Sequence, residues 1–570
     1  MTEKDAIGVE PRMEDVVSGS VKDAPCHEEV NLHKTLKDRH LSMIAMGGAL
    51  GTGLLIGTGS ALAQTGPGGI LIDYSIIGVI VFMVMAALGE MTSFAPMSRE
   101  CTRDYHLWRD IWYAKLSPGG FGGYATRFVD PALGFATGYA YFFKYLLATP
   151  NQLSALALII KYWTGDRISP AVWITIALLV VLVINFISVK AFGEFEFWLS
   201  SVKIIVMVGA IILLLVLALG GGPSAERTGF RYWNDPGAFA EYKFKGSLGR
   251  FVGVWTTMVQ AVYAYSGTEL VGVTVAEAQN PRLAMARAVK LTFFRIVIFY
   301  VLSVLFLGMV VPYNSSELAF AANSSNSAAA SPFVVAIQLA KIGGLDHVIN
   351  ACLLLFVISA ATSGTSSFHD YYIATRTIYN IAADGNAPKI FTRTNNRGVP
   401  IFAMILPTAF CLLAYMSISS GAKTVFTYLT SIVSTFVTHF YFSRAVKLQQ
   451  VPANLFAYRA PLREWGSMGA CLILCLLTLT KGFEVFLIEF DYKNFIVQYI
   501  GLPVYLFCLF GYKIYFRTSR VKAFEADLVT GVSMEPIEIT KARRKAEKEE
   551  SIRGKPAFIQ ACEKFLALCF

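Results

Sequence analysis

Twelve long apolar runs constrain what this chain can fold into. Runs of about 20 apolar residues match the ~30 Å hydrocarbon core of a bilayer and predict transmembrane helices. The chain of 570 residues is 55% hydrophobic and 15% charged, whereas soluble domains average about 25% charged residues. We therefore predict an all-α polytopic membrane protein with the spans 41–64, 68–95, 131–160, 171–190, 195–220, 250–275, 291–312, 344–363, 400–419, 424–443, 466–489 and 496–516.

The basic residues lie mostly between the spans. A net charge of +10 would suit nucleic acid if these side chains formed one patch, but they are spread over the loops after spans 2, 4, 6, 8 and 10. This alternation is a topology signal, because cytoplasmic loops carry an excess of Lys and Arg. It argues against a nucleic-acid partner and predicts that both tails, 1–40 and 517–570, are cytosolic.

Two of the apolar runs are interrupted by glycine and other small residues. Span 1 contains GALGTGLLIG (48–57), and span 6 contains YAYSGTELVGV (263–273). Glycine weakens a helix interior, and each interruption opens a block of five spans. We therefore expect a 41–516 transporter domain with repeat one at about 41–220, repeat two at about 250–443 and two further helices at about 466–516.

Eight motifs carry a family resemblance over almost the whole chain. In order they are LHKTLKDRHLSMIAMGGALGTGLLIGTGSAL (32–62), ALGEM (87–91), YATRFVDPALGFATGY (124–139), VKAFGEFEFWLSSVK (189–203), GFRYWNDPGAF (229–239), YSGTELVGVTVAEAQNPRLAMARAVK (265–290), ATRTIYNIAADGNAPKIF (374–391) and RVKAFEADLVTG (520–531). With these motifs the sequence resembles the fungal amino-acid permeases of the amino acid–polyamine–organocation superfamily.

The resemblance implies both a fold and an activity. The fold is like that of bacterial leucine transporters, with two inverted five-helix repeats, broken helices 1 and 6, and two additional helices. The implied activity is uptake of amino acids with protons across the plasma membrane, driven by the proton gradient and without a cofactor. The implied partners are the amino-acid substrate, protons, membrane lipid and ubiquitin-ligase adaptors at the cytosolic tails.

Three departures from the family pattern concern length. Residues 99–118 are an insertion in a cytosolic loop, explained either by a retained intron or by a genuine loop. Span 8 carries about six extra residues, roughly 364–369, and span 10 (425–442) lacks about nine. These departures leave an inactive or mis-spliced permease as one alternative.

The two breaks predict a binding site for a zwitterion. A helix broken inside the membrane frees N–H groups at one end and C=O groups at the other, which suit the carboxylate and ammonium of an amino acid. Alternatively, the span 1 glycines are packing residues, since Gly47/Gly51 and Gly53/Gly57 have G-x-x-x-G spacing. The predicted substrate-binding residues are Ala49, Gly51, Thr52, Gly53, Gln152, Tyr265, Ser266, Gly267 and Thr268.

Gln152 bears on substrate choice. Many members of the resembled family carry a glutamate at this position. A neutral amide reduces any local attraction for a cationic side chain, which argues against a dedicated lysine or arginine permease.

Ionisable residues inside spans are costly and therefore functional candidates. Glu269 follows the span 6 break and is the predicted proton-handling carboxylate, with closure of the broken helix as its alternative role. Lys203, near the start of span 5, is predicted to replace a coupling cation or carry a proton, or else to snorkel to the cytosolic surface. Glu90 and Glu277 are expected at the interface, the latter paired with Arg282.

Other chemistries find no support in the sequence. Walker, H-E-x-x-H and G-x-S-x-G motifs are missing, so we predict no enzyme, and His439 has no partner at metal-ligand spacing, so we predict no metal site. The remaining alternative is an amino-acid sensor that binds without transport. Sensors of this fold carry a longer N-terminal extension than the roughly 40 residues here, which favours transport.

Overall fold

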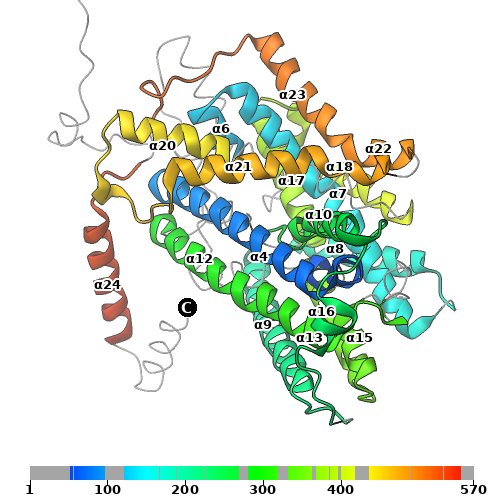
Figure 1. Cartoon of the computed structure of the whole chain (residues 1–570). Helices are drawn as coiled ribbons and strands as arrows, with labels where there is room; N and C mark the ends of the chain where they lie inside the picture. The colour runs from blue at the N-terminus through cyan, green and yellow to red at the C-terminus, as the bar shows by residue number, and fades with distance from the viewer. Residues whose placement is uncertain are drawn as a thin grey trace, which may run out of the picture.

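The computed structural model describes most of the permease domain. The described residues are 52–55, 57–96, 121–165, 167–187, 189–223, 225–268, 280–316, 318, 331–362, 367–383, 385–395, 400–416, 435–487, 490–529 and 532–553. Every regular element among them is helical, as Figure 1 shows. The all-α prediction is therefore confirmed.

Most of the main helices follow the predicted apolar runs, and the segments 121–128, 332–339 and 537–553 are helical outside those runs. The main helices are α3 (Thr52–Leu55), α4 (Gly57–Phe94), α6 (Phe121–Phe128), α7 (Pro131–Thr164), α8 (Pro170–Ile187), α9 (Val189–Ala218), α10 (Gly246–Ala264), α12 (Pro281–Arg295), α13 (Ser303–Val310), α15 (Pro332–Leu339), α16 (Leu345–Thr362), α17 (Ser367–Ala383), α18 (Ile401–Cys411), α20 (Thr438–Leu448), α21 (Arg463–Thr480), α22 (Tyr492–Tyr499), α23 (Gly501–Phe516) and α24 (Ile537–Arg553). The π-helix η3 (Ile296–Leu302) joins α12 to α13.

Several helices are long and apolar enough to cross a membrane. Among the described residues there are four, and a fifth if α22 and α23 form one span bent by 43°. The four are Gly57–Phe94, Trp198–Ala218, Pro281–Val310 and Arg463–Phe486. The count of twelve spans stays a prediction.

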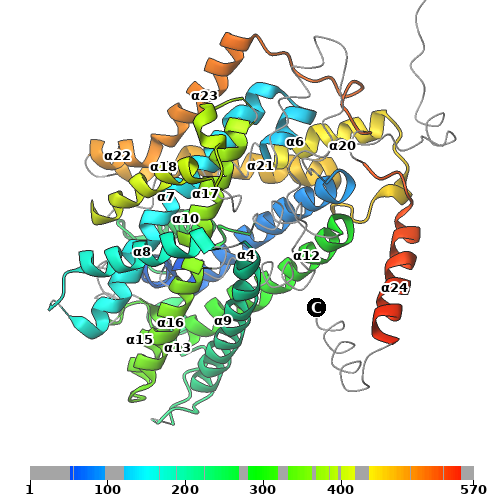
Figure 2. The same cartoon turned by 180° about the vertical axis from the view of Figure 1, so that it is seen from behind.

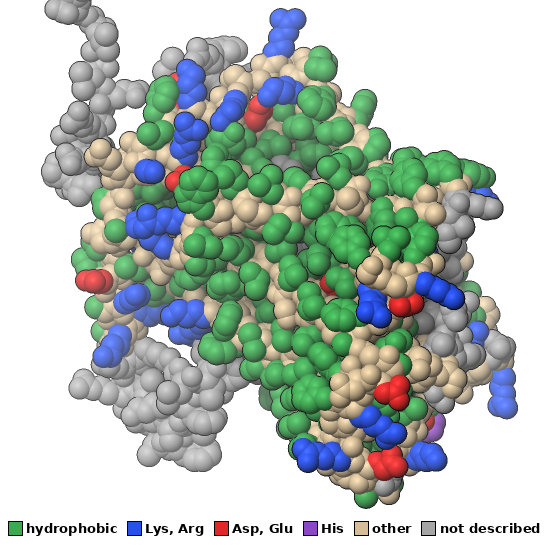
Figure 3. All heavy atoms as spheres, viewed as in Figure 1, with side chains coloured by type: hydrophobic (Ala, Val, Ile, Leu, Met, Phe, Trp, Pro, Cys, Tyr) green, Lys and Arg blue, Asp and Glu red, His purple; other side chains and the backbone are tan. Residues whose placement is uncertain are grey.

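The surface has an apolar face of the kind that lipid requires. Figure 3 shows hydrophobic side chains across the middle of one side, with Lys and Arg gathered toward its left edge and a smaller charged group at the lower right. Large apolar side chains such as Phe507 and Ile205 are 79% and 70% exposed. Exposed apolar area on this scale fits a hydrocarbon environment rather than water.

Helix α4 is the central element of one half of the core. It packs against α10, α12, α13 and α21, and Figures 1 and 2 show it running beside α12 from both sides. It is interrupted at Gly66, whose φ of +78° favours glycine. Gly68 N–H donates to the Ala238 carbonyl at 2.8 Å there, so the kink separates the end of span 1 from span 2 and docks the segment before α10.

Helix α7 organises the other half. It packs against α6, α8, α16, α17 and α23, and its N-cap Asp130 accepts a hydrogen bond from Ala132 N–H at 2.8 Å. The second carboxylate oxygen of Asp130 forms an ion pair with Lys513 at 2.6 Å. One carboxylate therefore caps α7 and fastens α23 to it.

The segment after α23 packs back onto the helices. Val521 N–H donates to the Val129 carbonyl at 2.8 Å, and Gln449 Nε2 donates to the Ala526 carbonyl at 2.8 Å. Residues 97–120, 363–366 and 417–434, which contain most of the predicted departures in length, lie outside the described part. Those three departures stay predictions.

Candidate functional site at the two helix breaks

The span 1 segment that is predicted to break lies against the end of the span 6 helix. Helix α3 packs on α10, and Gly53 is buried at the contact. A Cβ on Gly53 would stand 2.7 Å from the Cα of Ala264 and 3.1 Å from Cδ1 of Tyr263. Only glycine permits this approach. Gly53 therefore brings together two segments of main chain that are about 200 positions apart in the sequence.

The span 6 helix ends at the predicted place. Helix α10 stops at Ala264, and Tyr265–Thr268 form a turn in which Gly267 has a φ of +100°. Ser266 N–H donates to the Tyr263 carbonyl at 3.1 Å, and the Thr268 hydroxyl donates to the Tyr265 carbonyl at 2.7 Å. The turn supplies non-helical backbone at the level where α3 touches α10.

The Tyr265 side chain is engaged within the protein interior. Its ring stacks on Tyr300 with centroids 4.1 Å apart and planes 18° apart. Its hydroxyl donates to the Tyr74 carbonyl at 2.9 Å. The Tyr265 side chain thus connects the turn to α4 and η3. Only the main chain of Tyr265 remains to form the turn at the end of α10.

An arginine that sequence reasoning missed lies at the same turn. Arg295, at the end of α12, is fully buried, and its Nη2 donates to the Thr268 hydroxyl at 2.9 Å. A buried guanidinium is expensive unless it meets acceptors or negative charge. Its position inside the apolar run LTFFRIVIFYVL was the available signal, since ionisable residues within spans are functional candidates.

Helix α7 reaches the site from the opposite direction. Gln152 is buried at 3% exposure, and its neighbour Asn151 donates from Nδ2 to the Tyr263 hydroxyl at 3.0 Å. The Lys144 ammonium lies 5.2 Å from the ring centroid of Tyr145. The polar segment of span 3 is therefore connected to α10 one residue before its end.

Lys203 lies inside the protein. The side chain on α9 is 1% exposed, so the alternative in which it snorkels to the cytosolic surface is wrong for this arrangement. Four other predicted positions lie outside the described part, namely Ala49, Gly51, Glu269 and the Thr52 side chain. Glu277 lies outside it as well, so its pairing with Arg282 stays a prediction, and Arg282 donates from Nη2 to the Leu455 carbonyl at 2.6 Å.

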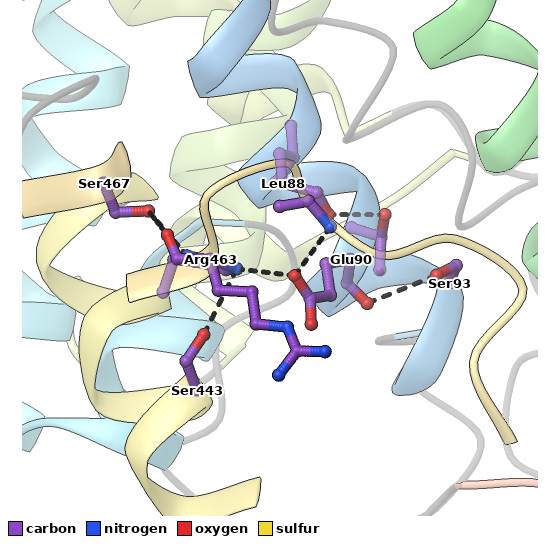
Figure 4. Close-up of polar contacts among 9 residues, drawn as sticks. Leu88, Glu90, Ser93, Ser443, Arg463 and Ser467 are labelled. Atoms are coloured by element: carbon purple, nitrogen blue, oxygen red, sulfur yellow. Dashed lines mark hydrogen bonds and ion pairs between the residues drawn. The ribbon is translucent and has the colours of Figure 1, made fainter. Parts of the chain in front are cut away.

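The other end of α4 carries a buried polar cluster. The sequence predicts Glu90 at the membrane interface. In the structure Glu90 is buried, at 5% exposure, and its Oε2 lies 3.0 Å from Nε2 of His439 on α20. The same oxygen accepts from Ala460 N–H at 2.9 Å, and Nδ1 of His439 lies 2.6 Å from the Ser467 hydroxyl. Figure 4 shows Glu90 between α4 and the start of α21.

The imidazole of His439 uses both of its ring nitrogens in this cluster. Nε2 contacts Glu90, and Nδ1 contacts the hydroxyl of Ser467 on α21. A histidine far along the chain therefore contacts the Glu90 carboxylate inside the protein, and the depth of Glu90 relative to the membrane interface stays a prediction.

Comparisons with known proteins agree with this architecture. A model of the family described as amino acid permease matches residues 40–105 and 110–523. The chain belongs to the amino acid permease family. It is an integral membrane protein of a transporter family, as the apolar helices also indicate.

Named relatives of this permease come from yeasts and a filamentous fungus. It is 46% identical to the dicarboxylic amino acid permease of Saccharomyces cerevisiae over 95% of this chain and 87% of the relative. It is 37% identical to a proline-specific permease of Emericella nidulans over 88% and 89% of the two chains. It is also 34% identical to the lysine-specific permease of Saccharomyces cerevisiae, over 88% and 78%.

Three features come together at the predicted binding site. Gly53 of α3 contacts the end of α10 just before the Tyr265–Thr268 turn, the buried Arg295 bonds to that turn, and α7 bonds to α10 through Asn151. Such elements bind charged groups through backbone dipoles and fixed donors rather than through reactive side chains.

Proposed function

We propose that this permease takes up amino acids across the plasma membrane, each with a proton, by alternating access around the two broken helices. The observation that carries the proposal is the contact of Gly53 with Ala264. The contact brings the predicted break of span 1 to the end of α10, and transporters built from inverted repeats bind their substrates between such broken helices.

Dicarboxylic amino acids are the substrate class that we propose. The support is the 46% identity to a relative named a dicarboxylic amino acid permease, together with the chemistry of the site. Arg295 places a buried positive charge beside the turn, which favours a substrate with an additional carboxylate over one with an additional ammonium.

Proton coupling is assigned to Glu269 and Lys203. Glu269 directly follows Thr268, the residue that Arg295 contacts, and burial of a carboxyl favours its protonated form. The buried ammonium of Lys203 takes the place of a metal cation, so the proton gradient is the driving force and no cofactor is needed.

The proposal also covers the topology of the two tails and the partners of the protein. Both tails, 1–40 and 517–570, face the cytosol, where their lysines serve as acceptor sites for ubiquitin and recruit ubiquitin-ligase adaptors. Lipid contacts the apolar face seen in Figure 3.

The test is uptake of labelled amino acids by transport-deficient cells that express the full chain. We expect saturable uptake of glutamate and aspartate, weak competition by lysine, and loss of accumulation in Glu269→Gln. Saturable binding without uptake would instead indicate a sensor. Undiminished accumulation by Glu269→Gln would remove that residue from the mechanism.

A further inference from the structure

A second buried carboxyl lies in α4, away from the helix breaks. Asp73 is seven positions after the kink at Gly66 and has 0% exposure. Its neighbours on the same face of α4, Ile70 and Ile77, are also fully buried. An ionised carboxylate costs several kcal/mol in such surroundings unless donors or cations compensate it.

Compensation for this carboxyl is incomplete. The hydroxyl of Thr257 on α10 bonds to Oδ2 of Asp73, and Oδ1 has no hydrogen-bond partner in the described part of the chain. Within that part Asp73 also forms no ion pair. One hydroxyl is too little to hold a negative charge here, since buried ionised carboxylates normally accept several hydrogen bonds.

Thr257 can serve both protonation states. Its Oγ1 lies 2.9 Å from the Gly253 carbonyl of its own helix as well as against Asp73. When Asp73 is ionised, Thr257 donates its single proton to the carboxylate. When Asp73 is protonated, the carboxyl donates to Thr257, which turns its own proton to Gly253, so that every hydrogen in the chain has an acceptor.

The charged and titratable groups around Asp73 are few. Those on elements packed against α4 at this level are Tyr265 of the turn after α10, Tyr300 of η3 and Arg295 of α12, with Tyr74 beside Asp73 on α4 itself. Helices α3 and α13 contain no titratable side chain. On the other elements that pack against α4, His439 of α20 bonds to Glu90 at the far end of α4, and Lys481 follows the end of α21. The further titratable groups are Tyr263 on α10, Cys471 and Cys475 on α21, and Asp235 in the π-helix η1 (Trp233–Gly237).

A polar route follows the same seam between α10 and the start of α4. Gln260 is one turn along α10 from Thr257, and its Nε2 donates to Oε1 of Gln64 at 2.9 Å. The Ser60 hydroxyl lies 3.4 Å from Oε1 of Gln260. All three residues are half-buried, so separation of the two helices would let water approach Asp73 along these polar side chains.

We propose that Asp73 is a proton-binding site of the transport cycle. Hydronium gives its proton to the Asp73 carboxylate and leaves as water when α10 moves away from α4. The neutral carboxyl then remains protonated while the helices are packed as they are here. The inference rests on the proposed proton-coupled uptake and adds a site distinct from Glu269.

The test uses the full chain reconstituted in liposomes, with Asp73→Asn and Thr257→Val compared with the unchanged protein. Asp73→Asn should lose gradient-driven accumulation of labelled glutamate by at least about tenfold while exchange of glutamate across the bilayer survives. A pH-sensitive dye inside the liposomes should show the matching loss of proton entry. Thr257→Val keeps the carboxyl but removes the hydroxyl that bonds to it in both protonation states, so the pH of half-maximal uptake should shift.

Each outcome has a defined meaning. Accumulation and proton entry equal to those of the unchanged protein in Asp73→Asn would overturn the proposal. If Asp73→Asn fails to fold, the pH profile of Thr257→Val decides, and an unshifted profile overturns it. If the unchanged protein itself accumulates glutamate without a proton gradient, the proposed function fails first, which is a distinguishable result.

Discussion

Gly53 and Ala264 meet so closely that a Cβ on the glycine would stand 2.7 Å from the Cα of Ala264. The contact brings the interrupted part of span 1 onto the end of α10, just before the Tyr265–Thr268 turn. Because the neighbour is main chain, it cannot move aside as the end of a flexible side chain would.

Gly53→Ala should therefore impair both packing and transport. Insertion of one methyl group against backbone costs about 1–3 kcal/mol in a well-packed core, and the site would open by the displaced distance. Melting of the purified protein and the uptake rate measure the two effects. Gly57→Ala is the matched control, since a Cβ there meets nothing within 4 Å. Equal behaviour of the two variants would contradict the close approach.

Arg295 and Thr268 should act as one unit. Loss of a hydrogen bond from a charged donor costs about 1.5–3 kcal/mol, so we expect Arg295→Met and Thr268→Val each to lower uptake of dicarboxylic amino acids. The double variant should be little worse than Arg295→Met alone, because that substitution already removes both the charge and the 2.9 Å bond to Thr268. Thr268→Ser keeps the hydroxyl and serves as the control. Additive losses would show that the two residues act separately.

Glu90 should contribute strongly to stability. Removal of one partner from a buried, hydrogen-bonded pair costs about 3–5 kcal/mol, and Glu90→Ala leaves both His439 and Ala460 N–H without their acceptor. Thermal unfolding in detergent measures the loss. Glu226→Ala is the comparison, because Glu226 and Arg231 form an exposed pair with side chains 74% and 66% exposed, worth about 0–1 kcal/mol. A small effect of Glu90→Ala on the unfolding temperature would show that the cluster does not stabilise the fold.

Asp130 should fasten the ends of two helices. Asp130→Ala removes the N-cap of α7, worth about 0.5–2 kcal/mol, together with the ion pair to Lys513. Asp130→Asn keeps an oxygen for Ala132 N–H and loses only the charge, so it should be milder. Unfolding temperatures that fall equally for the two variants would point to the ion pair as the whole effect.

The helices and the end of the span 6 helix were predictable from the sequence because each depends on local pattern. Runs of apolar residues set span length, and the glycines around residue 53 and the small residues around 267 indicate where helical backbone is unfavourable. The end of α10 at Ala264 follows this expectation. The contact between the two breaks follows from the repeat interpretation.

The side-chain partners were not predictable in the same way. His439 is 349 positions from Glu90, and Thr257 is 184 positions from Asp73. Whether two such groups meet depends on the rotation of each helix about its own axis, which apolar runs around the whole helix do not specify. Asp73 and Arg295 stand out in the sequence as ionisable residues inside apolar runs. Their roles could be inferred only once the structure showed their partners, Thr257 and Thr268.

The measurement that tests the central claim most directly is accumulation of labelled glutamate by liposomes containing the unchanged full chain, with and without an imposed inward proton gradient. The account predicts concentrative, saturable uptake with the gradient and only equilibration when an uncoupler collapses it. Accumulation that ignores the uncoupler, or none with either condition in folded protein, would contradict it.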